Sequence, residues 1–174
     1  MNKETIQQQL QSQYKAFIQI VHALDETQYS AAPQGKWNAG MQLEHLCKSV
    51  APVKLALSLP VFLTRLLFGK ANRPSRSFEV LVEKYQSKLA AGGRASAPYV
   101  PGQSRFADRN KWTLKLQGQV DSLVIKVDGF SENQLDELIL PHPLLGKLTL
   151  REMLYFTIYH AQHHQNSVLQ LTQQ

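Results

Sequence analysis

The chain has 174 residues, a formal net charge of +6 and one cysteine. This length is enough for one ordinary domain with a buried core, so we expect a single domain over residues 1–174. The lone Cys47 excludes an internal disulfide and favours a reducing, cytoplasmic setting.

The sequence predicts neither secretion nor a membrane span. Its first residues, MNKETIQQQLQSQ, carry glutamines where a signal peptide would have its apolar core. The most apolar run, Leu55 to Phe68, is shorter than the roughly 20 residues of a span and is interrupted by Pro60 and Arg65. We therefore expect this run to be buried or docked on the protein, and we expect no membrane partner.

The positive charge does not by itself predict nucleic-acid binding, because the cations form only a loose mid-chain basic zone. This zone consists of Lys70, Arg73, Arg76, Lys84, Lys88 and Arg94. Neither a Gly-rich phosphate loop nor a base-stacking aromatic motif accompanies it. We expect a solvated basic surface and no nucleic-acid partner.

The first predicted element is an amphipathic helix from Lys3 to Asp25, with apolar residues at steps of three and four. A break follows at Ala31 to Gly35. Asn38 is then a suitable N-cap for a second helix, and Trp37 would be the apolar residue just outside the cap.

The second helix has an apolar inward stripe with His45 at its edge. The stripe consists of Leu43, Leu46, Cys47, Val50 and Val53. Pro52 and Pro60 are expected to bend or end this helix. Glu44 should diverge from His45 and be solvated. Cys47 lies about 200° around the helix from His45, which predicts a buried, inert thiol.

The pattern weakens between the second and third long helices. The segment Phe78 to Ala91 is typical of a helix, and Gly92 to Ser104 is typical of a long irregular loop. We treat this part of the chain as an excursion from the main architecture.

The third long helix is predicted over Asp108 to Val127 and ends at Gly129. A loop containing Pro141 and Pro143 should lead to the last helix, whose start is marked by a capping box of Thr149 and Glu152. That helix should begin at Leu150 and run toward Leu171. Because no strand pattern alternates for long, we predict an all-α, four-helix bundle with a mid-chain excursion between the second and third bundle helices.

The strongest chemical signal is the histidine spacing in the last helix. His160 and His164 are about 40° apart around the axis and one turn apart along it, so both imidazoles can reach one ion. Their stripe also carries Met153, Phe156 and Leu171. Two buried imidazoles without partners would cost several kcal/mol, which a metal ion would avoid.

A His-x-x-x-His pair also occurs by chance in helices, so a third ligand decides the interpretation. His45 is the candidate, because it is expected near the inner face of the second helix. Three protein ligands with an open position are typical of catalytic zinc sites. His163 diverges from the pair and could replace His164, face solvent or contact a second acceptor.

The remaining histidines and the absence of two known motifs narrow the choice of metal site. His22 is expected at the surface and His142 in a structural turn. Neither a His-Glu-x-x-His motif nor a di-iron Glu-x-x-His pattern accompanies His160. Three neutral imidazoles would leave a divalent ion its full charge, which favours an anionic ligand such as a thiolate or hydroxide.

Several motifs resemble the DinB/YfiT-like superfamily of bacterial metal-binding proteins. They are Trp37-Asn38, His45-Leu46, His142-Pro143-Leu144-Leu145-Gly146-Lys147-Leu148-Thr149 and Tyr159-His160-Ala161-Gln162-His163-His164-Gln165. The resemblance implies a four-helix bundle that binds zinc, nickel or a similar ion through His45, His160 and His164. Asn38 stands where serine is common in that family, and the segment from Leu59 to Gly102 matches none of its motifs.

Relatives of this kind include thiol transferases that use bacillithiol or mycothiol, and metal-dependent hydrolases. The resemblance therefore implies an enzyme that activates a low-molecular-weight thiol or water for attack on a small electrophile, with the mid-chain basic zone available to carboxylates of an anionic thiol. The alternative is a non-catalytic module in which the ion serves stability, sensing or assembly. DNA binding is suggested by charge alone. A homodimer is also expected, through exposed apolar helix faces.

Overall fold

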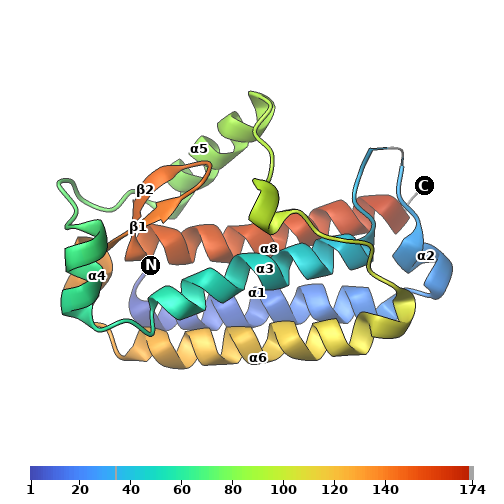
Figure 1. Cartoon of the computed structure of the whole chain (residues 1–174), viewed down its shortest axis with the longest axis horizontal. Coiled ribbons are helices and arrows are strands. Elements are labelled where there is room, and N and C mark those ends of the chain that lie inside the picture. Colours follow the sequence, from blue (N-terminus) through green and yellow to red (C-terminus); the bar gives the residue numbers. More distant parts are fainter. Residues whose placement is uncertain (34, 173–174) are drawn as a thin grey trace.

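The computed structural model describes residues 1–33 and 35–172. Four long helices run side by side along the molecule (Figure 1): α1 (Lys3–Ala23), α3 (Ala39–Ala56), α6 (Arg109–Asp128) and α8 (Leu150–Thr172). Shorter elements join them: α2 (Glu26–Ser30), α4 (Val61–Phe68), α5 (Phe78–Ala90), the 3₁₀ turns η1 (Ala97–Tyr99) and η2 (Phe106–Asp108), α7 (Glu132–Glu137), β1 (Ile139–His142) and β2 (Gly146–Thr149).

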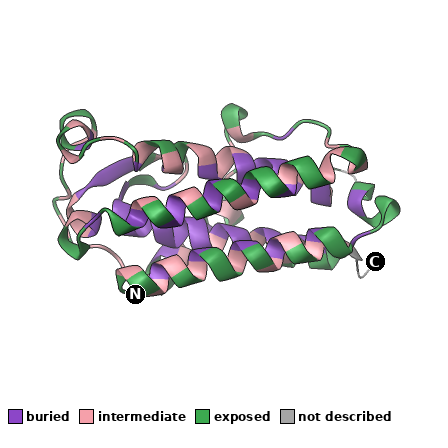
Figure 2. Cartoon of the chain, turned by 90° about the horizontal axis from the view of Figure 1, so that it is seen from below, coloured by how far each residue is buried: buried purple, intermediate pink, exposed green. Residues whose placement is uncertain are grey.

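The four long helices form the predicted bundle because each turns an apolar stripe inward. Figure 2 shows buried residues on the inner sides of the helices nearest the viewer and exposed residues on their outer sides. On α1, for example, the buried residues are Ile6, Leu10, Tyr14, Phe17 and Val21. Helix α1 packs chiefly against α8 and α6, and α3 packs chiefly against the same two helices. Helices α1 and α3 therefore lie on one diagonal of the bundle.

Two predicted helix starts are confirmed by their hydrogen bonds. The Met41 amide donates to the Asn38 side chain at 2.8 Å, which fixes the start of α3. At the start of α8, the Glu152 amide donates to Thr149 Oγ1 at 3.2 Å, and the Thr149 amide donates to Glu152 Oε2 at 2.9 Å. These starts set the positions of the histidines on both helices.

The segment predicted as a proline-containing loop before α8 is an antiparallel hairpin. Strands β1 and β2 pair with Leu140 opposite Leu148 and His142 opposite Gly146. Pro141 is tolerated because a two-stranded ribbon has free edges. Each strand has only four residues, so alternation could not reveal them. Two short helices, α2 and α7, were also missing from the prediction, although each begins with a capping box.

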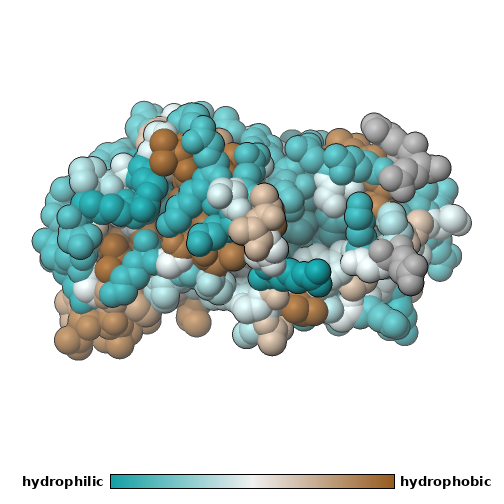
Figure 3. All heavy atoms as spheres, turned by 90° about the horizontal axis from the view of Figure 1, so that it is seen from above, coloured by the Kyte–Doolittle hydropathy of each residue, from teal (hydrophilic) through white to brown (hydrophobic). Residues whose placement is uncertain are grey.

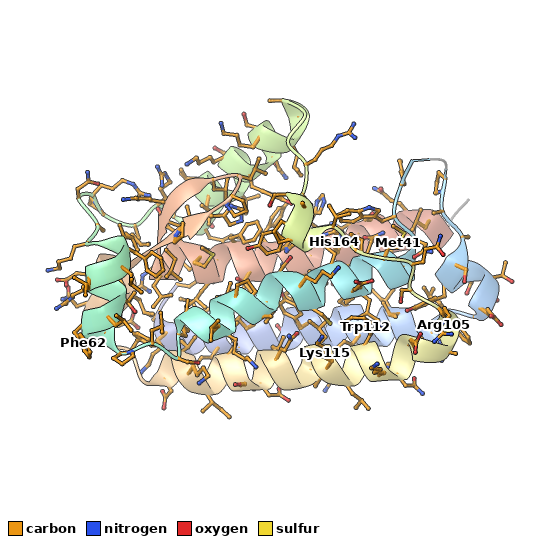
Figure 4. All side chains as sticks on the ribbon, in the orientation of Figure 1. Met41, Phe62, Arg105, Trp112, Lys115 and His164 are labelled. Atoms are coloured by element: carbon orange, nitrogen blue, oxygen red, sulfur yellow. The ribbon has the colours of Figure 1, made fainter. Side chains whose placement is uncertain are left out.

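The prediction for the apolar run from Leu55 to Phe68 was wrong in part. Pro52 does not end α3, which continues to Ala56, and the chain turns by 109° into α4. Four apolar side chains there are largely exposed: Leu55 (65%), Phe62 (71%), Leu66 (77%) and Leu67 (57%). Figure 3 shows an apolar surface at this end of the molecule, and Phe62 points outward in Figure 4.

The same bent pair of helices is relevant to the membrane question. Among the described residues, no single helix is both long and apolar enough to cross a bilayer. Helices α3 and α4 reach that composition only when taken together, across their sharp bend.

The mid-chain basic zone is less solvated than predicted. Arg73 and Arg76 both form ion pairs with Glu152, whose side chain is fully buried. Lys84 donates a hydrogen bond to the carbonyl of Leu145 at 2.9 Å. These cations attach the excursion to the hairpin and to the start of α8, because each finds an acceptor there that would otherwise be poorly satisfied.

Gly40 permits a close approach between α3 and the Tyr29 ring of α2. A Cβ atom at Gly40 would lie 2.5 Å from that buried ring. We expect Gly40→Ala to lower the free energy of unfolding by about 1–3 kcal/mol through overpacking, measured by denaturant titration. Gly118→Ala is the control, because nothing lies within 4 Å of its new Cβ and a better helix former should stabilise α6. Equal effects of the two substitutions would contradict the packing argument.

Candidate metal centre

Three buried imidazoles converge between α3 and α8. The Nε2 atoms of His45 and His164 each lie 3.1 Å from Nε2 of His160. All three atoms lie within 4.8 Å of one another, and they form a group that could hold a metal ion. His164, labelled in Figure 4, lies on α8 beneath the η1 segment. The structure thus brings together the three histidines singled out in the sequence.

Hydrogen bonds on the far side of two rings fix their orientation. His45 Nδ1 lies 2.7 Å from the carbonyl oxygen of Tyr99, and His164 Nδ1 lies 2.9 Å from Gln42 Oε1. The Gln42 amide nitrogen in turn donates to the Trp37 carbonyl at 3.2 Å, which assigns Oε1 to His164. Because these oxygens only accept, each Nδ1 carries the proton, and each Nε2 lone pair is directed at the common point.

The rings are electrically neutral. Burial lowers the pKa of His45, and it lowers the pKa of His160 and His164 well below the usual histidine value. The neighbouring imidazoles lower the pKa of the last two further, since two positive rings would repel each other. Neutral imidazole is also the form that binds metal ions.

The arrangement fits a divalent ion. With metal–nitrogen distances of about 2.0–2.1 Å, tetrahedral ligands lie about 3.3 Å apart, close to the 3.1 Å separations of His160 from its neighbours. Without an ion, one proton on His160 Nε2 could satisfy only one of the two facing lone pairs. A cation held between the three rings would accept a lone pair from each nitrogen, and all three nitrogens lie within 4.8 Å of one another.

The three imidazoles line a cavity of about 860 Å³. Its wall comes from α3, α5, α8, the hairpin and the segment from Gly93 to Val100. Among the described residues that line it, none is acidic, whereas Lys36 and Arg94 add positive charge. The cavity is therefore better suited to a neutral or anionic ligand than to a cationic one.

Aromatic rings enclose the histidines. The Trp37 ring lies 4.8 Å from the ring of His45 and 6.4 Å from that of His164, measured between centroids. Phe156 stacks on His160 at 4.9 Å. Trp37 therefore packs on the site, a contact that its predicted place outside the helix cap did not reveal.

The structure also places the other residues that the sequence analysis considered. His163 is partly buried, lines the cavity and packs near Tyr85 at 5.8 Å, and it is not one of the three converging rings. His22 is exposed, as predicted. Cys47 is buried, and burial raises the pKa of its thiol to about 12, which agrees with an inert role.

The prediction for Glu44 was wrong. Its side chain is buried, accepts a hydrogen bond from the Gly102 amide at 3.0 Å, and forms an ion pair with Lys48 at 2.8 Å. Lys48 also donates to the Val100 carbonyl at 2.8 Å. These bonds secure the loop that brings the Tyr99 carbonyl to His45, so Glu44 supports the site indirectly.

Gln42 and the Tyr99 backbone are the partners that the sequence did not reveal. A carbonyl carries no sequence signal, since every residue has one. Gln42 lies three residues before His45, on the same face of α3, and this spacing was the available clue.

We expect Gln42→Ala to weaken metal binding by about 10–100-fold, because His164 would lose the acceptor that holds its tautomer. Zinc affinity measured by competition with a chelator tests this. Gln11→Ala, at an exposed position on α1, is the control and should bind zinc like the wild type. Unchanged affinity in Gln42→Ala would show that the hydrogen bond does not support the site.

Comparisons with known proteins agree with the fold. A sequence profile described as the DinB superfamily matches residues 9–168. A search of the curated proteins finds no match. Among solved structures, the chain is similar to YfiT from Bacillus subtilis, described as "a probable metal-dependent hydrolase with an unusual four-helix bundle topology". The TM-score is 0.63 at 18% identity, over 98% of this chain and 86% of that one. The chain belongs to the DinB superfamily.

Proposed function

We propose that this protein is a metal-dependent enzyme that joins a low-molecular-weight thiol, or water, to a small electrophile. Its ligands are His45, His160 and His164, and its ion is zinc or nickel. The observation that carries the proposal is the convergence of three Nε2 atoms at the wall of a cavity of about 860 Å³. YfiT, which shares the fold, is described as a probable metal-dependent hydrolase, and this supports the same chemistry here.

A bound divalent ion would lower the pKa of a coordinated thiol or water and polarise an electrophile. The chain's own residues would bind the reactants and orient them. The neutral triad adds no negative charge, so an anionic nucleophile is not repelled. Arg94 and Lys36 in the cavity wall suit a thiol that carries carboxylates. Trp37 and Phe156 give the cavity apolar surfaces against which an uncharged part of a ligand can pack.

The test begins with purified, tag-free protein loaded with zinc or nickel. We expect one ion per chain, conjugation of a thiol to monobromobimane or hydrolysis of p-nitrophenyl acetate, and loss of both ion and turnover in His45→Ala. His22→Ala is the control, because its imidazole is exposed on α1. Metal uptake without turnover across thiols and esters would overturn the enzymatic proposal. A melting temperature that falls on metal removal would then favour the non-catalytic module.

A further inference from the structure

His142 is a further histidine of the cavity, and it is not one of the triad formed by His45, His160 and His164. It is the last residue of β1, and it lines the cavity wall. We propose that His142 is a fixed hydrogen-bond donor that orients the ligand by an acceptor oxygen. This inference rests on the proposed function, because it assigns a contact to the ligand of the same site.

The hairpin turn fixes the tautomer of His142. The amides of Leu144 and Leu145 both donate to His142 Nδ1, each at 3.1 Å. A nitrogen that accepts two hydrogen bonds carries no proton, so the neutral ring must carry its proton on Nε2. Pro143 follows directly and stiffens the turn that presents these two amides.

The protonated nitrogen is the polar atom of the ring that the hairpin turn does not use. Within the described part of the chain, Nε2 of His142 has no hydrogen-bond partner, and it is not among the unpaired polar atoms that are sealed from solvent. Since His142 lines the cavity while its Nδ1 is held in the turn, Nε2–H is the polar group left for a ligand.

The ring is rigidly placed beside the triad. It packs edge-on against Phe156 with centroids 4.2 Å apart, and Phe156 stacks on His160 at 4.9 Å. One aromatic ring therefore separates the donor from a proposed ligand of the ion. This places the donor within reach of a small molecule whose other end occupies the triad.

The electrostatic environment keeps the His142 ring uncharged, so that it remains a neutral hydrogen-bond donor. Burial, helped by nearby Lys84, lowers the pKa of His142 to about 4. A neutral donor of this kind favours a carbonyl, amide or carboxylate oxygen on the ligand. It does so without the long-range attraction for anions that Arg94 exerts.

Nitrogen NMR of the wild-type protein tests the tautomer directly. We expect His142 to show an unprotonated Nδ1 and a protonated Nε2, unchanged from about pH 5 to about pH 8. The assignment comes from loss of the signals in His142→Asn. A ring that protonates on Nδ1 in this range would overturn the inference, whether or not the protein is an enzyme.

Ligand binding tests the contact. Cobalt-substituted protein is titrated with 3-mercaptopropanamide, which has an acceptor oxygen, and with butanethiol, which lacks it. In His142→Asn the asparagine oxygen can still accept the turn amides, so the hairpin is retained while the Nε2–H donor is removed. We expect this variant to bind the amide thiol about tenfold more weakly and butanethiol as the wild type does.

The outcomes separate the two proposals. Equal weakening for both thiols, or for neither, would overturn the role of His142 while leaving the proposed function intact. If neither thiol perturbs the cobalt spectrum of the wild-type protein, the thiol chemistry of the proposed function fails. The NMR measurement then tests the role of His142 by itself. We expect the amide lines of the protein to shift when propanamide is added, and the absence of such shifts would contradict that role.

Discussion

Replacing His160 by alanine is expected to abolish stoichiometric metal binding and, with it, turnover. His160 Nε2 is the atom that both His45 and His164 face at 3.1 Å. Its loss should weaken zinc binding by more than the roughly 10–100-fold that follows loss of an outer hydrogen-bond partner. Metal content after dialysis and chelator competition measure the effect, and circular dichroism checks that the bundle is retained.

His163→Ala is the matched control, because it removes an imidazole from the same turn of α8. The sequence alone allowed His163 to pair with His160 in place of His164. In the structure His163 lies outside the converging group, so its removal should leave metal content unchanged. Full metal content in His160→Ala, or its loss in His163→Ala, would contradict the assignment of ligands.

Replacing Glu152 by alanine is expected to cost about 3–5 kcal/mol of unfolding free energy, the usual cost of breaking a buried ion pair. Arg73 contacts both carboxylate oxygens, at 2.6 and 2.8 Å. The Arg76 and Thr149 amides donate to the same group at 2.8 and 2.9 Å. Chemical denaturation measures the loss. Glu137→Ala is the control, since its ion pairs with Arg65 and Lys70 are near the surface, where water screens them, and its effect on stability should be much smaller.

The Glu152 pairs also predict how stability depends on pH. Burial alone would raise the pKa of this carboxyl, but the hydrogen bonds from Arg73, Arg76 and Thr149 outweigh it and leave the pKa below its usual value. The ionised form is thus favoured by folding. Its contribution is fully present above the unfolded pKa of about 4.3 and is lost as pH falls through the lower folded value. Part of the acid destabilisation of the wild-type protein should be absent in Glu152→Ala, and identical pH profiles would contradict this.

The bundle and the triad were predictable because their signals are local and periodic. Stripes at steps of three and four define the long helices, and the spacing of His160 and His164 places two imidazoles together. The partner histidine on α3 was a weaker inference from periodicity, because it lies only at the edge of a stripe. The structure places it against the other two.

The rest of the site depends on contacts that have no such signal. The carbonyl of Tyr99 reaches His45 only because a long loop folds back, and Glu44 holds that loop through a backbone amide. The hairpin was too short for alternation to show. The apolar side chains of α4 are exposed, although apolar runs are usually buried. A helix of eight residues can bury only one face, and this run has apolar residues on all its faces.

The carbonyl that faces His45 comes from a different part of the chain than the histidines, and this affects how the site can vary. The three converging nitrogens come from the long helices α3 and α8, whereas the carbonyl that faces His45 Nδ1 comes from η1, in the connection between α5 and α6. Insertions or replacements in that connection would alter both the hydrogen bond to His45 and the shape of the cavity in a single step. The surroundings of the three rings can thus change without any change of His45, His160 or His164.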